Sequence, residues 1–428
     1  MITERKTAMA HAFSYRQNRL FGENVDLQEF TARTETPFYI YSKQEIINNC
    51  SLVKQAGTGV DLLACYAFKA NFNPQLLKII RDMGLGADVV SGNELRLALH
   101  LGFDPQKIVF AGVGKTEQEI ELAVNSRIHS LNVESIEEYE QIERICSRLK
   151  KDIRIAVRIN PDVEAQTHAY ISTGTHINKF GVSSKEALSI YRRAVKNEWI
   201  RPEGIHMHIG SQITKVQPYI DAAAVIREFY EQVRNEGADL SFIDLGGGIG
   251  INYEYNFADS NDPVVYIQSL LPEYLQGFKD LDVKLIVELG RSIIASSGLL
   301  VSRVLYRKET PQKKFLIVDA AMNNLIRPSL YNAYHSIVPL VKNSRPAAVV
   351  DVVGPVCESG DFLAKDRELQ EMEQGEYIAV GGAGAYGAAL ASYYNLRPAI
   401  AEYLIDGEKT NTIFKAETFE DFVAKHGL

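Results

Sequence analysis

Short apolar runs alternate with amphipathic stretches along the first two thirds of the chain. The earliest clear run is Asp61-Leu-Leu-Ala-Cys-Tyr-Ala-Phe-Lys-Ala-Asn71, which is apolar from Leu62 to Phe68. Continuous apolar runs of this length are typical of strands in a parallel sheet that is covered on both faces. The pattern predicts strands at Leu62–Phe68, Gly86–Val90, Lys107–Ala111, Ile128–Val133, Ile153–Ile159, Gly204–Ile209, Phe242–Leu245 and Leu285–Glu288.

Stretches with apolar residues at helical spacing lie between these runs. They predict helices at Pro74–Met83, Gly92–Leu101, Glu117–Asn125, Ile136–Leu149, Lys185–Asn197 and Pro218–Glu236. Strand–helix units repeated eight times over roughly 250 residues predict a (β/α)8 barrel rather than an open doubly wound sheet. The connection from Pro161 to Ser184 is long and polar, and it has the size of an active-site loop.

After Arg291 the apolar runs become short and β-rich, with turn residues between them. Asp406-Gly407 separates the last two runs and predicts a hairpin, and a helix is expected at Phe419–His426. We therefore predict an α/β plus all-β protein with an N-terminal arm (1–36), a barrel (37–290) and a β domain (291–428). The strands expected in the β domain are Leu300–Tyr306, Phe315–Asp319, Ala348–Val353, Tyr377–Val380, Ala401–Ile405 and Thr410–Phe414.

The composition is that of an ordinary globular enzyme. Of 428 residues, 46% are hydrophobic and 23% are charged, and the net charge of -8 gives no support for binding to nucleic acid or to a membrane surface. The four cysteines lie far apart, without the spacing of metal ligands, which suits free thiols in a reducing cytoplasm. No apolar run reaches the length of a transmembrane helix, and residues 1–22 have no apolar signal core. We expect a cytoplasmic protein.

Polar and glycine-rich motifs stand at the ends of five predicted strands. Reactive residues of such barrels gather at the C-terminal ends of the strands, so these motifs predict a single ligand site. They are Lys69, Asp88 with Ser91, His206-Met-His208-Ile-Gly-Ser-Gln212, Gly246-Gly-Gly248-Ile-Gly250 and Glu288-Leu-Gly-Arg291.

Each motif alone has an ordinary structural explanation as well. The ammonium of Lys69 either reaches water or is partly desolvated, in which case it can attack an aldehyde. Gly246–Gly250 resembles half of a dinucleotide fingerprint, but its place after the seventh strand favours a phosphate cradle. His208 is either a core histidine or a ring that stacks on a flat ligand, and a buried Glu288 requires a cation or a proton. Together the four features predict a pyridoxal phosphate site without a metal.

Seven motifs occur in one order along the chain: Tyr66-Ala-Phe-Lys69-Ala-Asn71, His206 to Gln212, Gly246 to Gly250, Glu288 to Arg291, Arg327-Pro-Ser-Leu-Tyr331, Cys357-Glu-Ser-Gly-Asp361 and Gly384-Ala-Tyr-Gly387. The segments His168 to Gly174 and Asn178 to Gly181 match the same pattern. On these motifs, from about Pro37 to Pro398, the sequence resembles the fold-type III pyridoxal-phosphate decarboxylases, and among them the diaminopimelate decarboxylases.

The resemblance implies an alanine racemase-like fold: a TIM-like barrel, a C-terminal β-sandwich or β-barrel domain that the N-terminal arm joins, and a head-to-tail homodimer with active sites at its interface. It implies that Lys69 holds the cofactor, His208 stacks on its ring and Glu288 pairs with the pyridine nitrogen. Cys357 and Glu358 would come from the neighbouring subunit. The remaining cofactor contacts would be Asp88, Ser211, Gly247, Gly248, Leu289, Gly290, Arg291 and Tyr386.

One motif departs from the family pattern. The family usually has Glu-Pro-Gly-Arg where this chain has Glu288-Leu289-Gly290-Arg291. Leucine restores a backbone N–H and releases the φ angle that proline fixes. We expect a phosphate loop that is looser or has one more donor.

The charges at the site bear on the substrate. Arg291 and Arg327 suit recognition of a carboxylate, and their alternative is a structural ion pair with Asp319 or Asp361. Together with Tyr331, Tyr386 and Glu358 they predict a substrate with a distal carboxylate and a distal amine. The expected reaction is decarboxylation of meso-2,6-diaminopimelate to L-lysine, with Cys357 returning the proton unless it is a buried structural thiol.

The sequence alone leaves three alternative functions open. The first is a sibling decarboxylase that acts on ornithine, arginine, carboxynorspermidine or a conjugated amino acid. The second is an amino-acid racemase, which needs a tyrosine base and releases no CO₂. The third is a non-catalytic pyridoxal-phosphate-binding homologue, which has no need of Cys357, Glu358 and Arg327.

Overall fold

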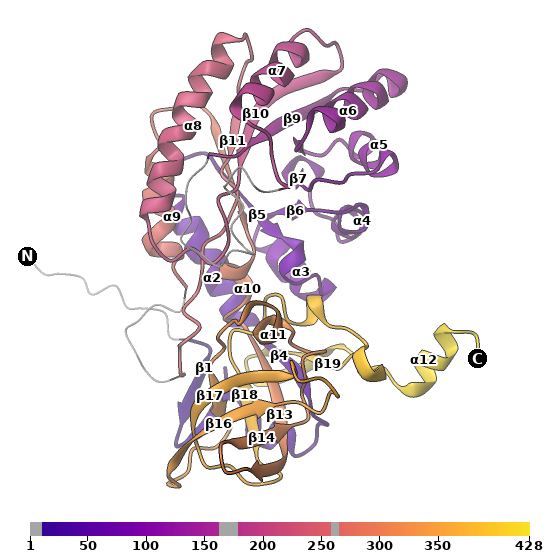
Figure 1. Ribbon diagram of the computed structural model, residues 1–428. Helices are drawn as coiled ribbons and strands as arrows, with labels where there is room; N and C mark the ends of the chain where they lie inside the picture. The colour runs from indigo at the N-terminus through magenta and orange to yellow at the C-terminus, as the bar shows by residue number, and fades with distance from the viewer. Residues whose placement is uncertain (1–10, 162–178, 258–264) are drawn as a thin grey trace, which may run out of the picture. The chain divides into compact units, whose positions relative to one another are not determined.

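The computed structural model describes residues 11–161, 179–257 and 265–428 (Figure 1). Within these residues the chain forms two compact units. The barrel unit consists of residues 49–250 and 266–292, and the β unit consists of residues 1–48, 251–265 and 293–428.

Eight parallel strands close into a barrel in the barrel unit. They follow one another in chain order, and the last lies beside the first, with Leu285 paired to Leu62. Every predicted strand is present near its predicted position, so the prediction of a (β/α)8 barrel is confirmed. The strands are β5 (Leu62–Ala67), β6 (Gly86–Val89), β7 (Ile108–Phe110), β8 (Ser130–Val133), β9 (Ile153–Ile159), β10 (Ile200–Met207), β11 (Phe242–Asp244) and β12 (Lys284–Leu289).

Helices surround the barrel (Figure 1). Polar residues start several of them: Thr116 and Ser183 each accept a bond from the third helical residue, whose side chain bonds back to the cap. Such capping boxes satisfy N–H groups that the helix itself cannot pair. The six predicted helices are all present, and α9 is additional. Their bounds are α3 (Pro74–Asp82), α4 (Gly92–His100), α5 (Glu117–Ser126), α6 (Ile136–Leu149), α7 (Ser184–Ala194), α8 (Gln217–Asn235) and α9 (Ile267–Gln276).

The barrel interior is filled in layers, because alternate residues of each strand point inwards. The ring of Phe242 fills the space that a side chain on β10 would occupy, since a Cβ atom on Gly204 would lie 2.1 Å from its Cζ atom. One layer is apolar and consists of Leu63, Cys65, Val109, Ala156, Phe242 and Ile286. Two residues further along several of these strands, the side chains are polar.

The β unit is built on a mixed sheet of nine strands, which confirms the predicted sheet-rich second domain. Its main path runs β17-β16-β14-β13-β4-β19-β20, and β18 and β15 pair beside β13. The bounds are β4 (Phe38–Ser42), β13 (Gly298–Glu309), β14 (Lys314–Val318), β15 (Ile337–Pro339), β16 (Ala347–Val353), β17 (Phe362–Gln370), β18 (Tyr377–Val380), β19 (Ala401–Asp406) and β20 (Lys409–Phe414). Its helices are α1 (Leu27–Thr31), α11 (Arg327–Tyr331) and α12 (Phe419–Lys425). Two further helices have residues in both units: α2 (Lys43–Ala56), which follows β4, and α10 (Arg291–Ile294).

The N-terminal segment packs into the core of the β unit. It forms a small sheet of β1 (Phe13–Arg16), β2 (Arg19–Gly22) and β3 (Val25–Asp26). Phe13, Leu20 and Leu27 are fully buried in one apolar cluster with Phe38 and Leu299. The arm is therefore held by the hydrophobic effect against strands that are distant in sequence.

The division into units differs from the predicted boundaries in three segments. Residues 37–48 and 251–265 were expected in the barrel but belong to the β unit, and residues 291–292 were expected in the β domain but belong to the barrel unit. Strand β4 explains the first difference, because it lies between β13 and β19, with Ile40 paired to Leu299 and Tyr403. The hairpin expected at Asp406-Gly407 joins β19 to β20. No helix in the described part of the chain is long and apolar enough to cross a membrane.

We expect Gly204→Ala to destabilise the barrel, because its new methyl group would overlap the buried ring of Phe242. Overpacking of this kind costs about 1–3 kcal/mol. The midpoint of urea unfolding should fall, and the added change Phe242→Leu should recover part of the loss. Gly114→Ala is the matched control, since a Cβ atom there would meet nothing within 4 Å. Equal midpoints for Gly204→Ala and Gly114→Ala would contradict this packing.

Candidate active site

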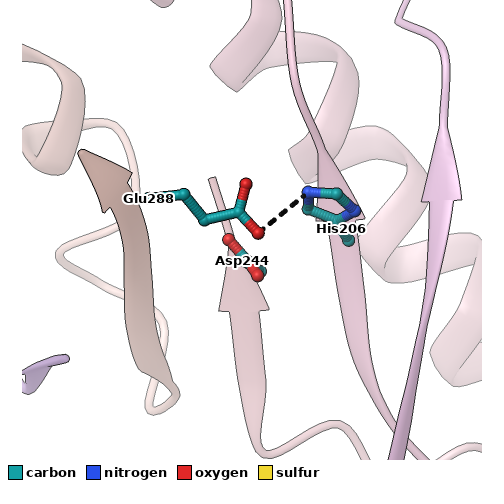
Figure 2. A group of neighbouring side chains, drawn as sticks. All are labelled: His206, Asp244 and Glu288. Carbon is teal, nitrogen blue, oxygen red and sulfur yellow. Dashed lines mark ion pairs between the residues drawn. The ribbon is translucent and has the colours of Figure 1, made fainter. Parts of the chain in front are cut away.

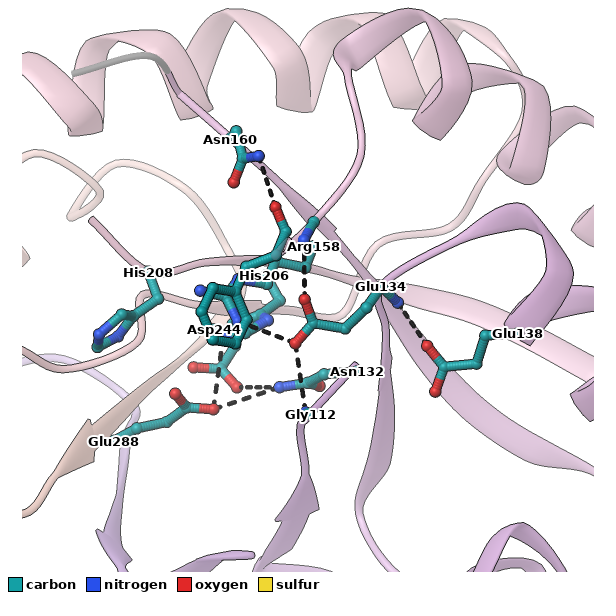
Figure 3. Close-up of polar contacts among 12 residues, drawn as sticks. Gly112, Asn132, Glu134, Glu138, Arg158, Asn160, His206, His208, Asp244 and Glu288 are labelled. Carbon is teal, nitrogen blue, oxygen red and sulfur yellow. Dashed lines mark hydrogen bonds and ion pairs between the residues drawn. The ribbon is translucent and has the colours of Figure 1, made fainter. Parts of the chain in front are cut away.

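A polar layer lies above the apolar layer inside the barrel. Asp244, Glu288 and Arg158 each stand two residues after an inward-facing member of the apolar layer, and His206 stands two residues after Gly204. Strand periodicity therefore carries these side chains to the C-terminal end of the barrel interior. Figure 3 shows them together with Asn132 of β8, and all five residues are buried.

Lys69 lies immediately after β5, in a single turn of 3-10 helix at Phe68–Ala70. Its Nζ atom lies 3.1 Å from Oδ2 of Asp88, the last residue but one of β6. The Lys69 side chain is 40% exposed, whereas that of Asp88 is fully buried. Lys69 thus presents an accessible amine at the barrel mouth with a carboxylate beside it.

His206, Asp244 and Glu288 form a compact buried cluster (Figure 2). Their nearest nitrogen and oxygen atoms lie within 4.8 Å of one another, and Nε2 of His206 is 3.5 Å from Oε1 of Glu288. Asn132 donates to both carboxylates, at 3.0 Å to Asp244 and 3.3 Å to Glu288, and the N–H of Gly246 donates to Asp244 at 3.0 Å. These residue types can also ligate a metal, but the N–H donors compete for the same oxygen lone pairs.

Two carboxylates this close in a buried site share one proton. Burial raises the pKa of Asp244 well above its usual range, and the charge of Glu288 raises it further. Burial alone would raise the pKa of Glu288 as well, but His206 and the ammonium of Lys69 outweigh it and lower that pKa below its usual range. We therefore assign the proton to Asp244 and the negative charge to Glu288. Burial, followed by the charge of Glu288, raises the pKa of Asp88 to about 7.

His208 is oriented by the glycine loop after β11. Its Nδ1 atom accepts a hydrogen bond of 3.1 Å from the N–H of Gly247, so Nε2 carries the proton of a neutral ring. Burial, aided by Arg158 and Lys69, lowers the pKa of His208 to about 3. A neutral, fixed imidazole ring is suited to stacking on a flat ligand.

The glycine loop packs too closely for side chains. A Cβ atom on Gly247 would lie 1.9 Å from the carbonyl oxygen of Glu288, and one on Gly248 would lie 2.2 Å from that of Gly210. Gly246 and Gly248 also have φ angles of 63° and 98°, which favour glycine. Backbone in such a loop can approach a phosphate closely.

Arg291 lies one residue beyond Gly290, which follows β12, and it begins α10. Its Nη2 atom donates to Oγ of Ser211 at 3.0 Å. Gly290 lies against the end of β5 and the turn that follows it, because a Cβ atom on Gly290 would be 3.2 Å from Cβ of Ala67 and 3.0 Å from Cβ of Ala70. Leu289 is buried and pairs in register with Tyr66. The structure thus brings together every cofactor residue that the sequence predicted within the barrel unit.

A second polar group adjoins this cluster (Figure 3). Glu134 accepts hydrogen bonds from Arg158 at 2.9 Å, from the N–H of Gly181 at 2.8 Å and from the N–H of Gly112 at 3.2 Å. Burial alone would raise the pKa of Glu134, but Arg158 and other cations lower it overall. Gly181 lies near the end of the predicted active-site loop (Pro161 to Ser184), most of which (162–178) lies outside the described residues.

Four residues of the site were not predicted from the sequence: Asn132, Glu134, Arg158 and Asp244. His206 was named only as part of a motif and was given no role. The signal that could have found them is a polar residue inside, or directly after, an apolar strand. Such a residue must be paired where it is buried, and pairing with polar residues of neighbouring strands produces a cluster.

The remaining predicted residues belong to the β unit. Arg327 begins α11 and is buried, while Tyr331 ends the same helix and is half-buried. The expected alternative partners of Arg327 accept other bonds: Asp319 from Ser302 and Arg303, and Asp361 from two backbone N–H groups.

Cys357 is exposed, so it is not the buried structural thiol considered as its alternative. Its N–H donates to Oδ1 of Asn395 at 2.7 Å. The neighbouring Glu358 accepts from the hydroxyl of Tyr394 at 3.3 Å. Tyr386 has a φ angle of 57° and is half-buried.

The barrel residues fit pyridoxal phosphate. An accessible lysine suits its aldehyde, a buried carboxylate suits its ring nitrogen, and a neutral histidine suits its ring face. Oδ1 of Asp88 is buried without a hydrogen-bond partner beside Lys69, as expected for a site completed by a polar ligand.

The proton assignment predicts how stability depends on pH. The pKa of Asp244 in the folded protein lies above its unfolded value of about 3.9, so the folded state binds the extra proton and stability falls as pH rises above about 4. Asp244→Asn should reduce this slope by up to about 1.4 kcal/mol per pH unit in cofactor-free protein. Urea unfolding between pH 4 and 8 measures it. Asp239→Asn, at an exposed site, should leave the slope as it is, and an unchanged slope in Asp244→Asn would contradict the assignment.

Known proteins that are similar to this chain show which family it belongs to. The model of the pyridoxal-dependent decarboxylase pyridoxal-binding domain matches residues 43–295. The diaminopimelate decarboxylase of Aquifex aeolicus is 45% identical and that of Pseudomonas aeruginosa is 41% identical, each over 97% of this chain; the matches cover 97% and 99% of those proteins.

Solved structures agree with these matches. The diaminopimelate decarboxylase of Helicobacter pylori complexed with L-lysine is 42% identical, with a TM-score of 0.88, over 94% of this chain and all of that one. The enzyme of M. jannaschii in complex with L-lysine is 35% identical, with a TM-score of 0.89, over 97% of both chains. The chain therefore belongs to the diaminopimelate decarboxylase family of pyridoxal-dependent decarboxylases.

Proposed function

We propose that this protein decarboxylates meso-2,6-diaminopimelate to L-lysine, using pyridoxal phosphate held in the barrel. The observation that carries the proposal is the pair of an accessible Lys69 amine and a buried Glu288 carboxylate at one end of the barrel. Two solved relatives hold L-lysine, which is the expected product. The family and the site chemistry therefore support the same reaction.

The bound cofactor would supply an electron sink for the pair left on the substrate carbon when CO₂ departs. Lys69 would bind the cofactor aldehyde through its amine and give way to the substrate amine. Glu288 would hold a proton at the pyridine nitrogen, which strengthens the sink. The protonated Asp244 supports this role, because it leaves the negative charge on Glu288.

Other residues of the barrel would orient the cofactor. His208, fixed by Gly247, would stack on the ring. The loop at Gly247 and Gly248, together with Gly290, Arg291 and Ser211, would bind the phosphate, and Asp88 would stay beside Lys69. Leu289 contributes backbone to this loop, where the family usually has proline. Rigid strand ends fix these groups before the substrate arrives, which lowers the cost of organising the site.

The substrate contacts would come from residues of the β unit together with Arg291. Arg327, Tyr331 and Tyr386 would bind the distal carboxylate, and Glu358 would bind the distal amine. Cys357 would return a proton to the carbon that has lost CO₂. Its exposure in the single chain leaves the thiol accessible for that transfer.

We infer that the active form is a homodimer in which Cys357 and Glu358 serve the partner's site. Large apolar side chains are exposed in the segment that bonds to these two residues, namely Leu390, Tyr393, Tyr394 and Leu396, and on α11 at Leu330. Exposed apolar patches of this kind mark protein interfaces. Four cysteines without a disulfide support a cytoplasmic location.

Lysine and CO₂ should form in equal amounts from meso-diaminopimelate, and Lys69→Ala should abolish both. The expected loss is large, because the amine that binds the cofactor is removed. Lys78→Ala, on the exposed face of α3, is the matched control and should keep full activity. A panel with ornithine and arginine tests the sibling activities. CO₂ release from ornithine but not from diaminopimelate would overturn the substrate assignment.

A mixing experiment tests the shared sites. Lys69→Ala and Cys357→Ala should each be inactive alone. After equal amounts are dissociated and reassembled, half of the dimers are hybrids with one intact site, so activity should recover to about a quarter of wild type. The control mixes each variant with itself. Failure of the hybrids to recover any activity would place both residues in the site of one subunit.

A further inference from the structure

Arg327 is held by a histidine that no part of the proposed chemistry uses. The arginine is only 5% exposed at the start of α11, and His335 is fully buried a few residues further along the chain. Nη1 of Arg327 lies 2.6 Å from Nε2 of His335. On the other side of the imidazole ring, Nδ1 lies 2.7 Å from the carbonyl oxygen of Gly381.

These two contacts determine the proton position on His335. A carbonyl oxygen can only accept, so Nδ1 must carry the hydrogen that it donates to Gly381. A guanidinium can only donate, so Nε2 must offer a lone pair to Arg327. His335 is therefore neutral, in a single tautomer, and acts as an acceptor for the arginine.

An aromatic ring adds to the support of Arg327. The Cζ atom of Arg327 lies 4.8 Å from the ring centroid of Tyr253, and the rings of Tyr253 and His335 meet edge to face at 5.0 Å. A guanidinium over a ring face is attracted by the ring quadrupole. Tyr253 and His335 thus fix the plane and the direction of the arginine, and neither adds a negative charge.

We propose that His335, assisted by Tyr253, is the positioning residue that aims Arg327 at the substrate carboxylate that remains in L-lysine. This inference rests on the proposed function. A carboxylate accepts two hydrogen bonds from a guanidinium when both groups lie in one plane. The pair is therefore strong only when the orientation of the guanidinium plane is fixed. A neutral support holds it without competing for the charge that the substrate needs.

Binding of two ligands by the holoenzyme tests the inference, because L-lysine and 1,5-diaminopentane differ only by the carboxylate. We expect His335→Ala to weaken L-lysine binding about tenfold or more by calorimetry, and to leave diaminopentane binding unchanged. With diaminopimelate, KM should rise far more than kcat falls. The cofactor absorbance and the thermal midpoint show whether each variant remains folded and loaded.

His335→Gln and His335→Asn form a matched pair. Both carry the same amide, but only glutamine extends far enough to accept from Arg327, whereas asparagine reaches only the Gly381 side. L-lysine affinity should therefore recover with glutamine and stay low with asparagine. This pair decides the question even if His335→Ala does not fold.

Each remaining outcome counts against the inference. Equal weakening of L-lysine and diaminopentane, or equal affinities for the glutamine and asparagine variants, would show a general structural role. Wild-type turnover of diaminopimelate with unchanged L-lysine binding in all His335 variants would overturn the inference alone. A wild-type holoenzyme that neither makes nor binds L-lysine would overturn the proposed function, and the inference with it.

Discussion

A carboxylate that is removed from water needs a cation or a set of hydrogen-bond donors to compensate its charge. This requirement at Glu288 determines which residues surround it in the site. The side chain is 3% exposed inside the barrel, so its charge is expensive unless it is compensated. Asn132, His206 and the nearby Lys69 supply part of the compensation, and a proton on Asp244 removes a competing charge. A protonated pyridine ring would supply the rest. In the proposed mechanism the buried acid would therefore both anchor the cofactor ring and keep its nitrogen protonated.

The barrel makes this arrangement possible. Parallel strands deliver residues two apart to successive layers, so an apolar layer around Phe242 lies directly beneath the polar one. The apolar layer excludes water and strengthens the electrostatic interactions above it. Lys69 lies outside the buried polar layer because β5 ends at Ala67 and the chain turns there. Its amine therefore remains accessible. Strand periodicity thus produces the buried acid cluster, and the end of β5 leaves the Lys69 amine accessible.

Much of the fold and several site residues could be predicted from the sequence. The barrel strands are continuous apolar runs, a pattern that depends only on local composition. Lys69, Asp88, His208 and Glu288 could be grouped because the C-terminal ends of parallel strands meet at one end of a barrel.

The parts that could not be predicted depend on contacts distant in sequence. Periodicity says nothing about which strand is a neighbour, so the pairing of β4 with β13 and β19 was missed. β17 was missed because its charged, partly exposed residues do not form an apolar run. Asp244 and Asn132 looked like isolated polar residues in apolar strands until the fold brought them together. His335 has no local signal at all, since its role depends on Arg327, Tyr253 and Gly381.

The proposed chemistry requires Lys69 to bind the cofactor aldehyde at the barrel mouth. Borohydride reduction of the holoenzyme, followed by proteolysis and mass spectrometry, tests this most directly, because reduction makes the lysine–cofactor bond permanent. We expect a pyridoxyl group on the peptide that contains Lys69 and on no other lysine. A pyridoxyl group at a different lysine, or none on any peptide of a fully loaded enzyme, would contradict it.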